Sequence, residues 1–413
     1  MRRPLFAALI LLGCGRPRAA APDASRTAIV EAPDVAATVE EEAPVIAPPL
    51  SPSSEAASRA FADGAEGFAW RVFRELSARP GNRVFSPSAT AVALSMAAAL
   101  DRGPAGARAL HAISATLDAD ALHRAAGTAL RAWQSEPGEG SGLLAVQRVF
   151  IDRAVRLEDA VGERLRTVYG APVGVVDTGG PEGARRRIDG FLHARMRGTT
   201  PEAIPELAIV ADGPAVVASA ALARFVCGGE VTSMPFAAGG VSPVETRAAR
   251  CAGDLRGGRG EGFTLWRVPS ADGAYALDVL LPDEPERLRA FEARLDAGVV
   301  RVAVEALRPA RETLAIPTVR VTNESPDGLR NTLMQMGCGD LFDPERSGLA
   351  RVGPGGRWVS ELYHRARFDL DVTDAPAAPG SVARRIDRPF VFVLRDRRLG
   401  AALALGHVVD PGR

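Results

Sequence analysis

Apolar and charged residues alternate without a break over residues 365–372. Ala366, Phe368, Leu370 and Val372 fall on one side of an extended chain, and two arginines and two aspartates fall on the other. Because successive side chains of a β-strand point to opposite faces, this pattern predicts a strand with one buried and one polar face. A strand of this kind needs a second layer of structure against its apolar side.

The first half of the chain predicts that second layer. Phe61, Phe68, Val72 and Leu76 recur at helical spacing, which indicates a helix over residues 58–78. Ser86 followed by Pro87 is a typical helix start, with serine as N-cap and proline at the first position. The helix that it begins is predicted to end near residue 100. Further helices are expected at residues 102–115, 119–134, 157–169 and 181–197.

Strand patterns become frequent later in the chain. Short apolar runs predict strands at residues 84–85, 143–151 and 207–226, and hairpins pairing 264–268 with 275–281 and 390–394 with 401–409. Helices first and antiparallel strands later indicate an α+β fold. No internal repeat is evident, so residues 58–413 are predicted to form one domain.

The N-terminus has the pattern of an export signal. Two arginines precede an apolar run that is too short to span a bilayer, and Gly13 and Cys14 follow it. Residues 11–14, Leu-Leu-Gly-Cys, resemble the lipobox of bacterial lipoproteins. We therefore expect a signal peptide at residues 1–13 and a lipid on Cys14 that anchors the chain to the cell envelope, in the periplasm or facing the surface. The alternative is an ordinary signal with an incidental cysteine.

Residues 14–57 are rich in alanine and proline and contain no aromatic residue. Such a stretch buries too little apolar surface to offset its chain entropy, so we expect a disordered tether.

Charge and composition exclude several classes of function. Fifty basic residues balance fifty acidic residues, so charge gives no reason to expect a nucleic-acid partner. Every basic residue is arginine. The absence of lysine excludes a Schiff-base enzyme, a P-loop nucleotidase and a protein kinase, because each needs a lysine amine.

The sequence also lacks the usual motifs of catalytic and metal sites. It has no nucleophile elbow, zinc-protease helix, paired Cys-x-x-Cys or dinucleotide fingerprint, and no two of its five histidines have metal-ligand spacing. We expect no catalytic residue, cofactor or metal. If Cys14 carries a lipid, three cysteines remain, and Cys227 with Cys251 is the nearer pair in sequence. An oxidising compartment permits a disulfide, and buried free thiols are the alternative.

Five short segments, in this order, resemble segments of the serpins, a family of serine protease inhibitors. They are Asn-Arg-Val-Phe-Ser-Pro at 82–87, Leu-Leu-Pro-Asp-Glu at 280–284, residues 337–344, Asp-Arg-Pro-Phe at 387–390 and Gly-His-Val-Val-Asp-Pro at 406–411. The resemblance implies an N-terminal helical region packed on a large mixed or antiparallel main sheet, with a second β-sheet barrel. It also implies a "shutter" group beneath the main sheet, consisting of Ser86, Pro87, Ser219 and His364. Ser219 stands where the family usually has asparagine, and Cys227 where it usually has tryptophan.

In serpins, an exposed reactive loop is cleaved by the target protease and then inserts into the main sheet as a new central strand. Insertion needs about fifteen extended residues, on the order of 50 Å at the strand rise, with free backbone donors. In this chain, the resemblance places the loop at Thr373, Asp374, Ala375, Pro376, Ala377, Ala378, Pro379, Gly380 and Ser381.

Nine residues reach only about 30 Å, and the two prolines cannot donate hydrogen bonds inside a sheet. We therefore predict a non-inhibitory protein, a monomer, that binds a ligand or a partner protein, such as a serine protease, at the cell surface.

Two alternative functions remain open on the sequence. Arg384 and Arg385 could enter the cleft of a trypsin-like protease as bait for reversible inhibition, or they could form a solvated strand edge. His364 could act as the base of a hydrolase, with Ser86 or Ser360 as nucleophile, or it could be a hydrogen-bonded core histidine.

Overall fold

A computed structural model describes residues 53–101, 103–134, 139–196, 204–205, 209–238, 242–322, 329–348, 358–374 and 383–412. The predicted signal peptide and Cys14 lie outside these residues, as does nearly all of the predicted tether. Within the described ranges, no helix has both the length and the apolar character needed to cross a bilayer.

The helices predicted from the first half of the chain are present. They are α1 (Glu55–Ser77), α2 (Pro87–Ala99), α3 (Pro104–Ile113), α4 (Ala119–Ala132), α5 (Asp159–Tyr169) and α6 (Pro181–Arg195). Helix α1 begins three residues before the predicted position because Ser54 caps it by accepting from the amide of Ala57. Ser86 caps α2 in the same way. Every residue of α2 is buried, so this helix lies at the centre of the helical layer.

Five strands of the main sheet lie side by side in the order β3-β2-β4-β12-β11, with β4 in the middle. These strands are β2 (Gly142–Asp152), β3 (Gly174–Val176), β4 (Ala215–Phe236), β11 (Val319–Thr322) and β12 (Val359–Asp374). Strand β12 runs parallel to β4 and antiparallel to β11. The predicted alternation in β12 is confirmed, because Ala366, Phe368 and Leu370 are buried while Arg367 and Asp369 pair with each other in less buried positions.

Strand β4 extends ten residues beyond the predicted end at residue 226, and its last part joins a second group of strands. These are β5 (Val244–Cys251), β10 (Thr313–Pro317) and β13 (Ala383–Arg385). The order there is β4-β5-β10-β13, with β13 parallel to β10. The first described residues after β12 are therefore those of β13, beside β10.

The other sheet has the order β1-β15-β14-β8-β7-β6-β9. Its strands are β1 (Arg83–Phe85), β6 (Arg256–Gly260), β7 (Phe263–Pro269), β8 (Tyr275–Pro282), β9 (Arg308–Pro309), β14 (Phe390–Asp396) and β15 (Ala402–Val408). Both predicted hairpins are confirmed in it. The predicted barrel is wrong, because among the described strands the end strands β1 and β9 do not pair with each other. A barrel closes only when every strand has two neighbours.

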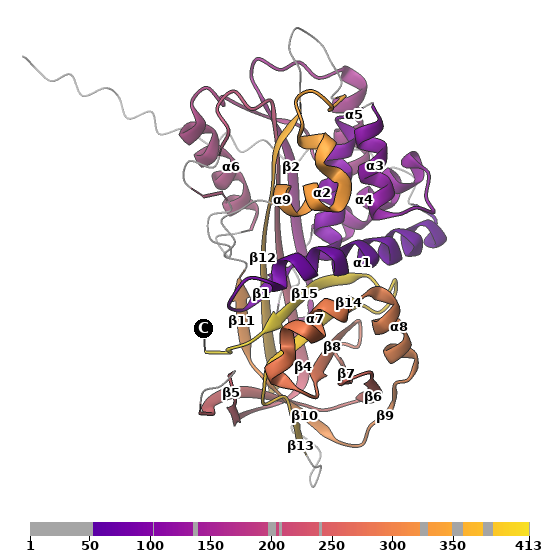
Figure 1. Cartoon of the computed structure of the whole chain (residues 1–413), viewed down its shortest axis with the longest axis vertical. Helices are drawn as coiled ribbons and strands as arrows, with labels where there is room; N and C mark the ends of the chain where they lie inside the picture. The colour runs from indigo at the N-terminus through magenta and orange to yellow at the C-terminus, as the bar shows by residue number, and fades with distance from the viewer. Residues whose placement is uncertain are drawn as a thin grey trace, which may run out of the picture. The chain divides into compact units, whose positions relative to one another are not determined.

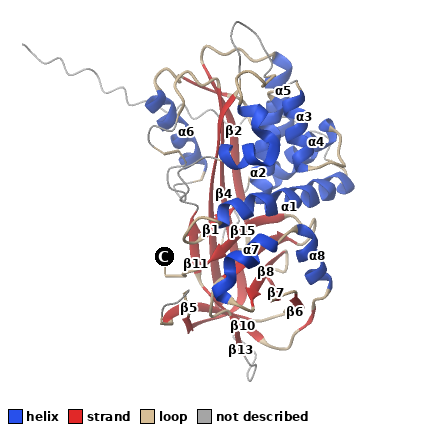
Figure 2. Ribbon diagram, viewed as in Figure 1, coloured by secondary structure: helices blue, strands red, loops and turns tan. Residues whose placement is uncertain are grey.

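The remaining short helices are α7 (Leu288–Arg294), α8 (Ala297–Glu305), α9 (Arg330–Leu333), η1 (Pro285–Arg287), η2 (Met334–Cys338) and η3 (Gly339–Phe342). Figures 1 and 2 show α2 to α5 on one face of the main sheet and α6 on the other. Each face buries its own apolar cluster, with Ile188 and Leu192 of α6 in the smaller one.

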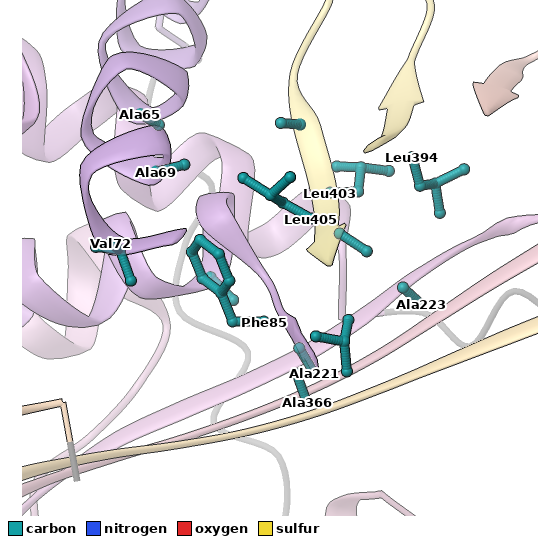
Figure 3. Close-up of a cluster of buried hydrophobic side chains, with 14 of the residues drawn as sticks. Ala65, Ala69, Val72, Phe85, Ala221, Ala223, Ala366, Leu394, Leu403 and Leu405 are labelled. Carbon is teal, nitrogen blue, oxygen red and sulfur yellow. The ribbon is translucent and has the colours of Figure 1, made fainter. Parts of the chain in front are cut away.

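The larger cluster holds the helices and both sheets together. In Figure 3, Phe85 of β1 lies between Ala69 and Val72 of α1 and the strands that carry Ala221 and Ala366, with Leu405 of β15 nearby. Because β4 and β12 supply small alanines here, the helical layer and the other sheet, which contains β1 and β15, can both approach the centre of the main sheet.

Candidate functional site

The imidazole of His364 links the two central strands of the main sheet to helix α2. His364 lies on β12 directly opposite Ser219 of β4. Its Nδ1 is 2.9 Å from the Ser219 hydroxyl oxygen, and its Nε2 accepts a hydrogen bond of 3.0 Å from the backbone N–H of Ser86. Because Nε2 accepts, the single proton of the neutral ring is on Nδ1, which donates to Ser219.

Gln147 of β2 is a fourth member of this group that the sequence analysis did not identify. Its side-chain amide nitrogen donates to the Ser219 hydroxyl at 3.2 Å, and its side chain is buried. The sequence does contain a sign of this residue's role: Gln147 directly follows four apolar residues in the strand predicted at residues 143–151. Buried polar groups need partners, so such a residue indicates a polar contact across the sheet.

The surroundings of His364 do not support proton transfer to a substrate. Burial lowers the pKa of His364 from its ordinary value of 6.5 to about 3, so the ring is neutral at physiological pH. The Ser86 hydroxyl caps α2, and the Ser360 hydroxyl donates to the carbonyl of Ala215 at 2.6 Å. No hydrogen bond between His364 and either hydroxyl is found in the described residues, so the geometry does not favour the hydrolase alternative.

The first two residues of the predicted reactive loop belong to β12. Thr373 pairs with Gly228 and Asp374 with Gly229 in the parallel ladder with β4. The predicted start of the loop at Thr373 is therefore wrong, because the ladder continues past the last alternating residue, Val372. Residues 375–381 of the predicted loop lie outside the described residues.

Gly229 makes the junction between β4, β12 and β5 possible. A side-chain Cβ there would lie 2.1 Å from the carbonyl oxygen of Arg250 on β5. Only glycine therefore lets β5 come close enough to pair with β4 at the point where β12 ends.

A disulfide joins Cys227 of β4 to Cys251 of β5 next to this junction. Both residues are fully buried, and their Cα atoms are 5.6 Å apart. Cys338 is a buried free thiol, and burial raises its pKa to about 11. The sequence left open whether Cys227 and Cys251 form a disulfide or are buried free thiols, and in the structure they form a disulfide.

Arg384 and Arg385 lie on β13, at the end of the strand order. Both side chains are exposed, and Arg384 makes a 3.5 Å ion pair with Glu312. Their backbone is held by the parallel ladder with β10, and the amide of Ile386 donates to the carbonyl of Ala315. The described geometry is that of a solvated strand edge.

Comparison with known proteins gives one consistent result. Residues 63–411 match the sequence pattern of the family described as serpin (serine protease inhibitor). A putative serpin-Z6C of Oryza sativa is 26% identical over 86% of this chain and 98% of its own length. A probable serpin E3 of Danio rerio is 28% identical, over 36% of this chain and 38% of its own length. The crystal structure of mouse protein Z-dependent protease inhibitor superposes with a TM-score of 0.75 and 16% identity, covering 87% of this chain and all of that one.

The family match covers nearly the whole arrangement described above, from within α1 to beyond the end of β15, and the structural match reproduces the fold at low sequence identity. The family is described by protease inhibition and not by a catalytic activity. On these grounds, the chain belongs to the serpin family.

Proposed function

We propose that this chain is a non-inhibitory serpin that is exported, held at the cell envelope by a lipid on Cys14, and acts by binding a partner protein or ligand there. One observation carries the non-inhibitory part of the proposal. Strand β12 remains paired with β4 up to Asp374, and β13 begins at Ala383. The segment available for insertion is therefore residues 375–382.

The length of this segment does not match the length of the sheet that it would have to enter. Strand β12 has 16 residues, which corresponds to about 53 Å at 3.3 Å per residue. Residues 375–382 span roughly 26 Å when fully extended. Even if the whole segment entered the sheet, it would cover only about half of the ladder between β4 and β12.

The hydrogen bonds argue in the same direction. An inserted strand must separate β4 from β12 along the inserted length and then pair with both of them. Pro376 and Pro379 have no N–H to donate, so two of the few inserted residues would leave ladder positions unpaired. The free energy that drives insertion in an inhibitory serpin would therefore be largely missing.

Incubation with trypsin-like and subtilisin-like proteases tests the proposal. We expect cleavage of the segment but no covalent complex on denaturing gel electrophoresis. A Pro376→Ala, Pro379→Ala double variant is the matched control: it restores both donors without adding length, and it should also form no complex. A protease-linked band that survives denaturation, in either protein, contradicts the proposal.

The lipid anchor rests on the sequence of residues 11–14 and needs its own test. Cell fractionation of the natural chain and a Cys14→Ala variant should show the natural chain in membranes and the variant in the soluble exported fraction. An equal distribution of the two proteins would rule out the anchor but leave the argument about insertion untouched.

A further inference from the structure

Residues of helices α2, α3, α4 and α5 line a half-open cavity of about 430 Å³. Figure 1 shows these helices gathered on one side of the main sheet. The wall consists mainly of alanine, glycine, leucine and valine, with Ala98, Ala99 and Leu110 buried inside and Ala107, Ala119 and Ala160 exposed at the rim. Its volume lies in the range of about 300–1,000 Å³ that is typical of small-molecule sites.

His123 of α4 brings a polar atom into this apolar wall. Its side chain is only 3% exposed, and its Nδ1 is 2.5 Å from the hydroxyl oxygen of Tyr169. Its Nε2 has no hydrogen-bond partner among the residues that the structure describes. Nε2 is not one of the fully buried atoms of the described residues that lack a partner, so it remains accessible, and water or a ligand atom in the cavity can complete its hydrogen bonding.

The contact with Tyr169 determines which ring nitrogen of His123 carries the proton. Burial raises the pKa of Tyr169, so its phenol stays protonated, and burial lowers the pKa of His123 to about 4, so its ring stays neutral at pH 7. A phenol is a stronger hydrogen-bond donor than a neutral imidazole, so we assign donation from Tyr169 to Nδ1. The ring proton then lies on Nε2, which offers a donor to a ligand.

Two charged side chains, Asp101 and Arg164, also line the cavity, and they differ in how many hydrogen-bond or ion-pair partners they already have. The carboxylate of Asp101 accepts hydrogen bonds from the amides of Gly103, Gly106 and Gly348 and from the Ser347 hydroxyl. Arg164 of α5 is 41% exposed and, within the described part of the chain, makes one ion pair, of 3.3 Å, with the more exposed Asp120. Such a surface pair is weak, so Arg164 can take a further anionic partner.

We propose that this cavity binds a small monocarboxylate with an aliphatic body, the carboxylate between Arg164 and the Nε2–H of His123 and the body against the alanine-lined wall. Neither group belongs to the shutter or to the segment after β12. The site is therefore independent of whether the chain inhibits proteases, and it extends the proposed function rather than depending on it.

Isothermal titration calorimetry of the purified chain tests the site with sodium octanoate, and with octanol as an uncharged probe of equal length. We expect saturable one-to-one binding of octanoate and weaker binding of octanol. Ala160→Leu fills the rim at an exposed helical position and should abolish binding. Arg164→Gln should weaken octanoate binding by up to about five-fold, the upper end of the range for one exposed ion pair.

Arg166→Gln is the matched control, because Arg166 is on the same helix, pairs with Glu163 and does not line the cavity. It should change octanoate affinity by less than about two-fold, since exposed substitutions away from a site have small effects. Circular dichroism melts establish that each variant folds, and Arg164→Gln decides the matter if Ala160→Leu does not fold. The absence of saturable octanoate binding, an unchanged affinity in folded Ala160→Leu or in Arg164→Gln, or equal binding of octanol overturns the proposal.

Discussion

The hydroxyl oxygen of Ser219 on β4 lies 2.9 Å from Nδ1 of His364 on β12. These two strands are the ones that would have to separate if a new strand entered the main sheet. The same imidazole accepts from the backbone of Ser86, at the start of α2. Separating the strands therefore breaks a buried hydrogen bond as well as the ladder.

Replacing His364 with alanine should destabilise the protein strongly. The change removes a buried ring and leaves the Ser86 amide and the Ser219 hydroxyl without their partner, at a cost of about 3 kcal/mol in the free energy of unfolding. Urea denaturation at pH 7 measures it. His193→Ala, at an exposed position, is the control and should change stability by less than about 0.5 kcal/mol. Equal stability of the two variants would contradict the role given to His364.

Acid should destabilise the protein through the same residue. In the unfolded chain, His364 takes up a proton below its ordinary pKa of 6.5, whereas burial in the folded protein holds its pKa at about 3. The unfolded state therefore binds more protons between these values. The free energy of unfolding falls as the pH drops from 6.5, by up to ~1.4 kcal/mol per pH unit for this group.

Denaturation curves between pH 7 and 4 test this sign. His364→Ala should show a shallower decline than the natural protein over the same range, although it starts from a lower stability. The remaining slope belongs to other groups, among them His123, whose pKa burial also lowers. If the free energy of unfolding fell equally steeply with pH in both proteins, His364 would not contribute to the loss of stability in acid.

Removing the disulfide should lower stability by roughly 3 kcal/mol, because the bond closes a loop with a sequence separation of 24 in the unfolded chain. A Cys227→Ala, Cys251→Ala double variant measured by thermal melting checks this, with Cys338→Ala as the control that leaves the bond intact. Alkylation of the unreduced, denatured protein should label Cys338 but neither Cys227 nor Cys251. Labelling of either would show that the two thiols are free.

Cleavage between β12 and β13 should not stabilise the protein. Subtilisin acting within residues 375–382 is expected to leave the melting temperature unchanged to within about 3 °C, or lower it, because little of the segment can add to the sheet. The melts of the intact and nicked proteins are compared directly. A rise of more than about 10 °C would indicate strand insertion.

Arg384 and Arg385 should not give reversible inhibition of trypsin. Entry into a protease cleft requires the backbone of β13 to leave its ladder with β10, and Arg384 also to leave Glu312. Steady-state trypsin assays should give the same rate without the protein, with it and with the Arg384→Ala, Arg385→Ala variant. Tight inhibition that this double substitution removes would establish the bait function.

Local features of the chain were sufficient to predict much of the fold. The alternation at residues 365–372, the Ser86 cap before Pro87 and the helical spacing that begins at Phe61 all appear in the structure at or near their predicted positions. Caps and periodicities depend on neighbours within a turn or a strand, so they can be read along the sequence. The order of the short motifs added the family resemblance and the position of His364.

Other features depend on residues that are distant in the sequence, and only the tertiary structure decided them. Gln147 lies opposite Ser219 because β2 pairs with β4, and Cys227 meets Cys251 because β5 folds back on β4. Strand β12 continues to Asp374 because Gly228 and Gly229 extend the ladder. Nothing local in β1 or β9 shows that, among the described strands, the sheet they belong to does not close into a barrel. The physical reason is that strand neighbours and register are set by the packing of the whole domain, and a shift of one residue moves every side chain to the opposite face.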